Sequence, residues 1–236
     1  ITCRDWSSDV CSSDLAAGTL QAARTALEQG FCFFLGGGMH HAQYDHGSGF
    51  CLVNDMVIAA VKLLEEKRVS RVWIIDIDAH KGDGTAALCS GREDILTLSI
   101  HMAQGWPLDK ESLLVYGPGN PSLIPSTVEL PIPSGGEPGY ISTLGRGLEK
   151  LKEVSPSLPD LALVVDGSDP YEKDALPSTA LLNLSEKTML ERDLKVCNFL
   201  KNLGIPSAWV MAGGYGEESW RIYFQFLKRI LGSLEE

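Results

Sequence analysis

The segment DIDAHKGDGT, residues 76–85, carries side chains that could bind a metal ion. Side chains alternate in direction along an extended chain, so Asp76, Asp78 and His80 point to one side of it. Acidic and histidine side chains at the end of a strand can instead cap the following helix. Strict alternation of three such residues, followed by Gly82-Asp83-Gly84, favours a functional site over helix capping.

Asp78 and His80 are two ligands of the types that zinc accepts. A third carboxylate, supplied by Asp169 after another predicted strand, would complete a three-ligand set. Such a set leaves one coordination position open for water and substrate, as catalytic zinc requires. The sequence therefore predicts a catalytic metal site.

A tandem histidine pair lies in the segment GGGMHHA, residues 36–42. Consecutive glycines allow the backbone to turn tightly and to approach a site closely. A single histidine is more often a core residue, but the adjacent His40 and His41 at such a turn indicate acid–base catalysis or metal binding. Each imidazole needs a partner that fixes its tautomer, and the carboxylates of Asp76 and Asp83 are available for that purpose.

Tyr215 lies in the segment AGGYG, residues 212–216, just after another apolar run. A tyrosine after two glycines is usually an ordinary loop aromatic, so this signal is weak by itself. Beside a metal ion and a histidine pair, its hydroxyl becomes a suitable donor to an oxyanion that develops during acyl transfer.

Short apolar runs that alternate with helical patterns predict the framework behind these residues. Such alternation is typical of βαβ units and predicts a mainly parallel sheet with helices on both faces. Ligands bind outside the carboxyl ends of strands in open α/β sheets, so polar side chains that follow four separate strands should converge on one site. The predicted strands are Phe31–Leu35, Arg71–Asp76, Ile95–Ile100, Thr127–Leu130, Leu161–Val165 and Ser207–Met211. The predicted helices are Ala16–Gln29, Asn54–Lys67, Thr85–Cys89, Pro138–Val154, Ser185–Leu203 and Glu217–Leu231, and the rest of residues 103–136 is expected to form long loops.

The composition indicates one acidic globular domain, because 236 residues with 44% hydrophobic content can bury a substantial core. A formal charge of −11 argues against nonspecific nucleic-acid binding, which depends on Lys and Arg, although it could attract cationic substrates. No apolar run reaches the roughly 18–20 residues of a membrane span, and Ile1–Leu15 lacks the apolar region of a signal peptide. Six cysteines without CxxC spacing indicate a reducing compartment, so we expect a cytoplasmic protein.

Residues 1–14, ITCRDWSSDVCSSD, differ in character from the rest of the chain. They are polar and partly self-repeating, and they follow neither helical nor strand periodicity. We interpret them as a non-native segment resembling translated vector sequence, with a natural disordered tail as the alternative. The domain is therefore expected to span residues 15–236.

Five motifs in this order and spacing resemble those of the histone deacetylase family, from about residue 16 to the C-terminus. They are GGGMHHA, GSGFCLVND (residues 47–55), DIDAHKGDGT, DGSDPYEKD (residues 166–174) and AGGYG. The DGSDPYEKD form is more similar to bacterial and class IV members than to class I. The family includes acetylpolyamine amidohydrolases, and the resemblance implies the arginase-deacetylase fold, which is a three-layer αβα arrangement.

The resemblance also implies roles for residues at matching positions. The implied zinc ligands are Asp78, His80 and Asp169, and the implied catalytic pair is His40 and His41, with Asp76 and Asp83 as their respective partners. Tyr215 matches the tyrosine that stabilises the tetrahedral intermediate. Phe50 matches a wall of the acyl-lysine tunnel, and Gly213 and Gly214 would line the site nearby. The family's structural potassium ion would lie at Asp76, Asp78, His80, Ser99 and Ile100.

Two departures from the family pattern affect these expectations. Lys81 stands where many members have a second histidine, a position that the family tolerates. The segment before the tandem histidines is shorter than in the family, which implies that the first strand region and a substrate-gripping aspartate loop are missing. Deleting such a strand would expose apolar surface and unpaired edge groups, so this polypeptide alone is expected to be poorly soluble or nearly inactive.

The function predicted from these residues is hydrolysis of N-acetyl groups from lysine side chains or related amines. The substrate would be an acetylated protein or a small acetylated amine, without nucleic acid or membrane. One alternative is an arginase-like dimanganese ureohydrolase, although Gly82 stands where that chemistry places an acid. A second alternative, which the shortened N-terminus leaves open, is a non-catalytic module that binds acyl-lysine.

Overall fold

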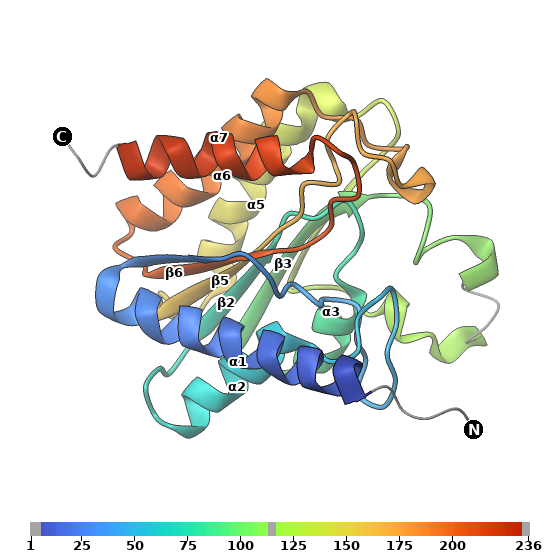
Figure 1. Cartoon of the computed structure of the whole chain (residues 1–236). Helices are drawn as coiled ribbons and strands as arrows, with labels where there is room; N and C mark the ends of the chain where they lie inside the picture. Colours follow the sequence, from blue (N-terminus) through green and yellow to red (C-terminus); the bar gives the residue numbers. More distant parts are fainter. Residues whose placement is uncertain (1–5, 113–116, 233–236) are drawn as a thin grey trace.

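Six short apolar segments form one sheet in which all neighbouring strands are parallel (Figure 1). The computed structural model describes residues 6–112 and 117–232. The strand order across the sheet is β1-β6-β5-β2-β3-β4, so the chain starts at one edge and crosses the sheet repeatedly. The strands are β1 (Phe31–Phe34), β2 (Val72–Asp76), β3 (Ile95–Met102), β4 (Val128–Ile132), β5 (Leu161–Asp166) and β6 (Ser207–Met211).

Helices cover both faces of this sheet, which gives the three-layer arrangement expected from the sequence (Figure 1). Helices α1 (Trp6–Gln29) and α2 (Asp55–Glu65) lie on one face, and α5 (Tyr140–Val154), α6 (Glu186–Asn202) and α7 (Ser219–Gly232) lie on the other. The short helix α3 (Asp83–Cys89) follows β2. The single-turn 3₁₀ helices η1 (Gly117–Gly119), η2 (Pro121–Leu123), η3 (Glu137–Gly139) and η4 (Pro177–Thr179) lie between these elements.

The central strands are buried on both faces, which explains their continuous apolar sequences. In β2, Trp73 and Ile75 belong to the core beneath α5, α6 and α7, whereas Val72 and Ile74 belong to the core beneath α1 and α2. This alternation follows from the two-residue period of a strand. Two apolar layers therefore hold β2 and β5 firmly, and the residues that follow these strands start from a fixed position.

Most element boundaries agree with the sequence prediction, and two differences have a local cause. Strand β3 extends to Met102 because its last residues pair with β4. Helix α1 starts at Trp6 rather than Ala16, so it includes residues for which the sequence indicated no helical periodicity. A helix that has been nucleated adds one hydrogen bond per residue, which favours such an extension. The non-native origin of residues 1–14 stays a prediction, and residues 1–5 lie outside the described residues.

Within the described part of the chain, none of the helices is both long enough and apolar enough to cross a membrane.

Candidate metal centre and active site

Three predicted metal ligands meet at the carboxyl ends of β2 and β5. Asp78 and His80 follow β2, Asp169 follows β5, and the three side chains offer ligand atoms within 4.8 Å of one another. His80 Nδ1 lies 3.2 Å from an oxygen of Asp78 and 3.0 Å from Oδ2 of Asp169. All three residues are buried. The structure therefore brings together the ligand set that the sequence predicted.

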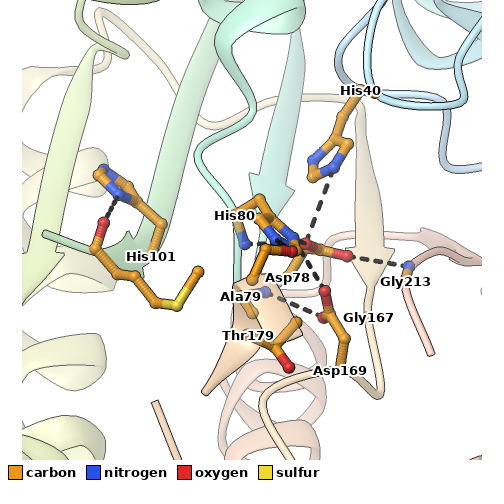
Figure 2. A network of polar contacts seen from close by, with 12 residues as sticks. His40, Asp78, Ala79, His80, His101, Gly167, Asp169, Thr179 and Gly213 are labelled. Atoms are coloured by element: carbon orange, nitrogen blue, oxygen red, sulfur yellow. Dashed lines mark hydrogen bonds and ion pairs between the residues drawn. The ribbon is translucent and has the colours of Figure 1, made fainter. Parts of the chain in front are cut away.

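Backbone N–H groups hold the two carboxylates in place (Figure 2). Gly213 N donates to Oδ2 of Asp78 at 2.9 Å, and Ala79 N donates to Oδ1 of Asp169 at 3.0 Å. A Cβ atom at Gly213 would lie 2.5 Å from Asp169 and 2.6 Å from Asp78, so this position leaves space only for glycine. Gly167 is equally constrained, because a Cβ atom there would overlap the Asp78 carboxylate.

The donor set fits a divalent cation. Oδ2 of Asp169 is buried and accepts no hydrogen bond from the described residues, although His80 Nδ1 is near it. Burial, together with the negative charge of Asp78, raises the pKa of Asp169 to about 7. Two carboxylates crowded in a buried site repel each other, and a cation between them would remove that cost. Two carboxylates and one imidazole are ligands that zinc accepts.

Ser178 contacts the ring nitrogen of His80 that lies away from the two carboxylates. Its hydroxyl oxygen lies 3.0 Å from Nε2 of His80, on the side of the ring away from the two carboxylates. Metal-binding histidines commonly use one ring nitrogen for the metal and bond the other to a nearby polar group. His80 is therefore arranged to offer Nδ1 to a metal.

His40 and His41 follow β1, and each contacts the carboxylate predicted for it. His40 Nδ1 lies 2.7 Å from Asp76 Oδ2, and His41 Nδ1 lies 2.7 Å from Asp83 Oδ1. Ser122 donates a further hydrogen bond to Asp83, at 2.5 Å. These contacts fix the orientation of both rings and leave each Nε2 free of the paired carboxylate.

The two histidines differ in their electrostatic surroundings. Burial opposes charging of His40, but Asp76 and Asp78 outweigh it and raise the pKa of His40 to about 9. For His41, burial and the nearby charge of His40 outweigh Asp83 and lower the pKa to about 4. At neutral pH His41 is therefore the histidine with a nitrogen able to accept a proton.

Asp55 anchors the glycine turn that carries the histidine pair. Its carboxylate accepts hydrogen bonds from Gly38 N at 3.0 Å, from Met39 N at 2.7 Å and from the Thr19 hydroxyl at 2.5 Å. Gly38 has φ of +75°, and a Cβ atom there would lie 2.7 Å from Ala212. The sequence indicated the need for glycine here but gave no sign that Asp55, on the first turn of α2, fixes the turn.

A cavity of about 340 Å³ opens above His41 and His80. Its wall includes Phe50 and Tyr215, whose ring centroids are 6.1 Å apart. Tyr215 N donates to Asp174 Oδ2 at 2.8 Å, which fixes the backbone just after Gly214. Burial and the carboxylates of Asp78 and Asp169 raise the pKa of Tyr215, so its hydroxyl remains a donor at neutral pH. The cavity thus joins one predicted metal ligand, His80, with His41 of the histidine pair and with Tyr215.

Residues 5–227 match the family model described as histone deacetylase domain. The chain belongs to the histone deacetylase family. An uncharacterized protein of Picosynechococcus sp. is 33% identical over 90% of this chain and 66% of its own length. Histone deacetylase 2 of Arabidopsis thaliana is 29% identical over 87% of this chain and 49% of its own length. The acetoin utilization protein AcuC of Staphylococcus aureus is 32% identical over 80% of this chain and 46% of its own length. The chain thus spans from about half to just under two thirds of these relatives.

Three cavity residues of this histone deacetylase family member were not found by the sequence analysis. Trp106 lies at the bottom of the cavity, where its ring centroid is 4.4 Å from that of His41 and 5.7 Å from that of His80. Leu176 and Ser178 complete the wall. All three belong to long connections without a periodic pattern, where the only local signal is an isolated large aromatic in Gly105-Trp106-Pro107.

The positions that the family resemblance assigned to potassium also lie together. Ser99 pairs with Asp76 across β3 and β2, and Ser99 and Ile100 are buried.

Lys81 is buried too, and its ammonium group lies 2.9 Å from Glu129, which also contacts His101 at 2.8 Å. Figure 2 shows His101 apart from the cluster of Asp78, His80 and Asp169. The departure from the family pattern at Lys81 is therefore accommodated by an ion pair with β4.

Proposed function

We propose that this chain hydrolyses N-acetyl groups from lysine side chains or related amines, with zinc held by Asp78, His80 and Asp169. The observation that carries this proposal is the opening of one cavity onto His80, His41 and Tyr215. Membership in the histone deacetylase family supports an amide hydrolase, and one relative is named a histone deacetylase.

Zinc, when bound, supplies Lewis acidity toward the acyl carbonyl and the attacking water. His41 lines the cavity and takes the proton of the water, while Asp83 holds its ring. The same histidine, assisted by His40, then gives a proton to the leaving amine. The hydroxyl of Tyr215 donates to the oxyanion that develops on the acyl oxygen. Water and amide are consumed, and acetate and a free amine are produced.

The cavity also supports a narrow acyl-amine substrate. Its volume of about 340 Å³ lies at the lower end of the range for small-ligand sites. The aromatic rings of Phe50, Trp106 and Tyr215 would pack along an aliphatic chain that leads to the acetyl group. An acetylated protein lysine and a small acetylated amine both have such a chain. We further propose a structural potassium ion beside Ser99, on the basis of the family resemblance. We also propose a cytoplasmic location, on the basis of the cysteine pattern.

The test uses the full chain stripped of metal and then reconstituted with one equivalent of zinc. Acetate release is measured with an acetyl-lysine peptide and, separately, with N-acetylputrescine. We expect release from at least one substrate with zinc, none with the stripped protein, and release slowed by a factor on the order of 10²–10⁴ with reconstituted His41→Ala. Such release would also contradict the expectation from the sequence that this polypeptide alone is nearly inactive. A folded, zinc-loaded chain that releases no acetate from either substrate would contradict the proposal. A metal analysis that gives two manganese ions per chain would instead favour the ureohydrolase alternative.

A further inference from the structure

Arg192, in α6, is fully buried at the back of the metal centre. An arginine is almost never fully buried unless its charge is paired. Helix α6 contributes no side chain to the wall of the cavity. The proposed reaction therefore gives this residue no role, although its burial requires compensating contacts.

The guanidinium group of Arg192 donates to four acceptors. Nη1 donates to the backbone carbonyl oxygens of Ile77, at 2.9 Å, and Gly167, at 2.8 Å. Nη2 donates to Asp166 at 2.6 Å, and Nε donates to Asp193 at 2.7 Å. One nitrogen thus connects the segment after β2 with the segment after β5.

Both carbonyl groups lie next to metal ligands in the chain. Ile77 immediately precedes Asp78, and Gly167 lies two residues before Asp169. The register between β2 and β5 runs to Asp76 and Val165, and Ile77 N donates to Val165 O at 3.0 Å. Arg192 links the two segments just beyond this point, where they turn to present the ligands.

We propose that Arg192 is a positioning residue for the metal centre, and that it fixes the spacing between Asp78 and Asp169 by holding the carbonyl groups of Ile77 and Gly167 on one nitrogen. The inference rests on the proposed metal site, and it adds a residue from outside the cavity. Ligand geometry is sensitive to such support, because loss of a group that orients a ligand typically lowers metal affinity about 10–100-fold.

The planar guanidinium is needed for this link. It presents five N–H donors in a fixed fork, whereas a lysine ammonium group presents three donors at a single point. Arg192→Lys would keep a positive charge beside Asp166 and Asp193, but it would not span both carbonyl groups while pairing both carboxylates. The substitution therefore separates charge compensation from the positioning of the ligands.

The experiment compares the wild-type chain with Arg192→Lys and with a matched control, Asp193→Asn. Asp193 contacts the same guanidinium, at Nε, and among the described residues no hydrogen bond or ion pair joins its side chain to the segments after β2 and β5. For each protein, the dissociation constant for zinc is measured by competition with a chelator, and the visible spectrum of bound Co²⁺ reports the ligand geometry. The melting temperature of the metal-free protein measures the general loss of stability.

We expect Arg192→Lys to raise the dissociation constant for zinc about 10–100-fold and to change the Co²⁺ spectrum. Asp193→Asn should leave both close to wild type, even where it lowers the melting temperature to a similar extent. Equal affinity and an identical spectrum in Arg192→Lys would overturn the proposal, as would an equal affinity loss in Asp193→Asn.

A second variant covers the case in which Arg192→Lys does not fold. The double substitution Arg192→Gln with Asp166→Asn removes one positive and one negative charge together, so the buried net charge is unchanged. The same loss of zinc affinity is expected, and wild-type affinity would overturn the proposal. Because acetate release is not among the readouts, a failure of the proposed reaction is distinguishable from a failure of this inference.

Discussion

At the floor of the cavity the ionisable side chains of Asp78, His80, Asp169, His40 and His41 are buried and have partners within the protein. At the rim, formed by Phe50, Leu176 and Tyr215, both aromatic side chains face solvent. Phe50 is 82% exposed and Tyr215 is 44% exposed. The floor lies on strand ends between two apolar layers, whereas the rim comes from connecting segments. The comparison indicates that contacts within the protein hold the side chains of the floor, whereas two side chains of the rim are accessible from solvent.

Asp169→Ala is expected to have the largest effect, because it removes a floor ligand and leaves two ligands from one short segment. The wild-type chain should bind about one equivalent of zinc, and the variant should lose most of it and all measurable turnover. Elemental analysis after dialysis gives the metal content. Stoichiometric zinc in the variant would show that the third ligand is wrongly assigned.

His41→Ala is expected to retain zinc and to lower turnover by a factor on the order of 10²–10⁴, because it removes proton transfer at the floor. Initial rates on an acetyl-lysine peptide provide the measurement, with metal content determined in parallel. His46→Ala is the matched control, since His46 does not line this cavity. Similar rates for the two variants would exclude His41 as the base.

Tyr215→Phe changes one hydroxyl at the rim and should slow turnover on the order of 10²–10³-fold, the usual cost of losing one oxyanion donor. Zinc content and substrate binding should stay close to wild type. Tyr44→Phe is the control, because Tyr44 is 92% exposed and lies outside this cavity. Near-normal turnover in Tyr215→Phe would remove the proposed oxyanion role.

Phe50→Ala should have the smallest effect, because it removes only an exposed apolar contact at the rim. We expect KM for an acetyl-lysine peptide to rise about tenfold, which corresponds to roughly 1.4 kcal/mol, with kcat and zinc content almost unchanged. Steady-state kinetics on the peptide separate the two parameters. A loss in kcat as large as that of Tyr215→Phe would mean that floor and rim do not differ as described.

The floor could be predicted from the sequence because its residues lie at regular positions after apolar strands. Asp78 and His80 show the two-residue period of an extended chain, and the parallel sheet brings Asp169 to the same edge. Trp106 and Ser178 could not be predicted, because tertiary contacts rather than local pattern determine the course of their loops. The buried position of Arg192 could not be predicted for another reason. It stands in the run ERDLK, whose charges are typical of a solvated helix face.

Helix α1 shows a different limit of prediction. Its start at Trp6 lies inside a segment that has no amphipathic pattern, and Asp55 looks like an ordinary first-turn acid of α2. The structure links the two helices through the hydrogen bond from Thr19 to Asp55, and thereby links both to the glycine turn. A single sequence shows each helix separately, but such a contact between residues 36 positions apart follows only from how the helices pack.

The strand order also determines the order in which the strands can pair during synthesis of the chain. Strand β1, which precedes the histidine pair, is bordered only by β6, the last strand that the structure describes. A ribosome that adds about 5–20 residues per second needs roughly 10–35 s to proceed from β1 to β6. The strands that carry the three metal ligands emerge earlier and are neighbours in the sheet. A nascent chain therefore completes β2 and β5 before β6 is available to pair with β1, so the segment that carries His40 and His41 takes its place only late in synthesis.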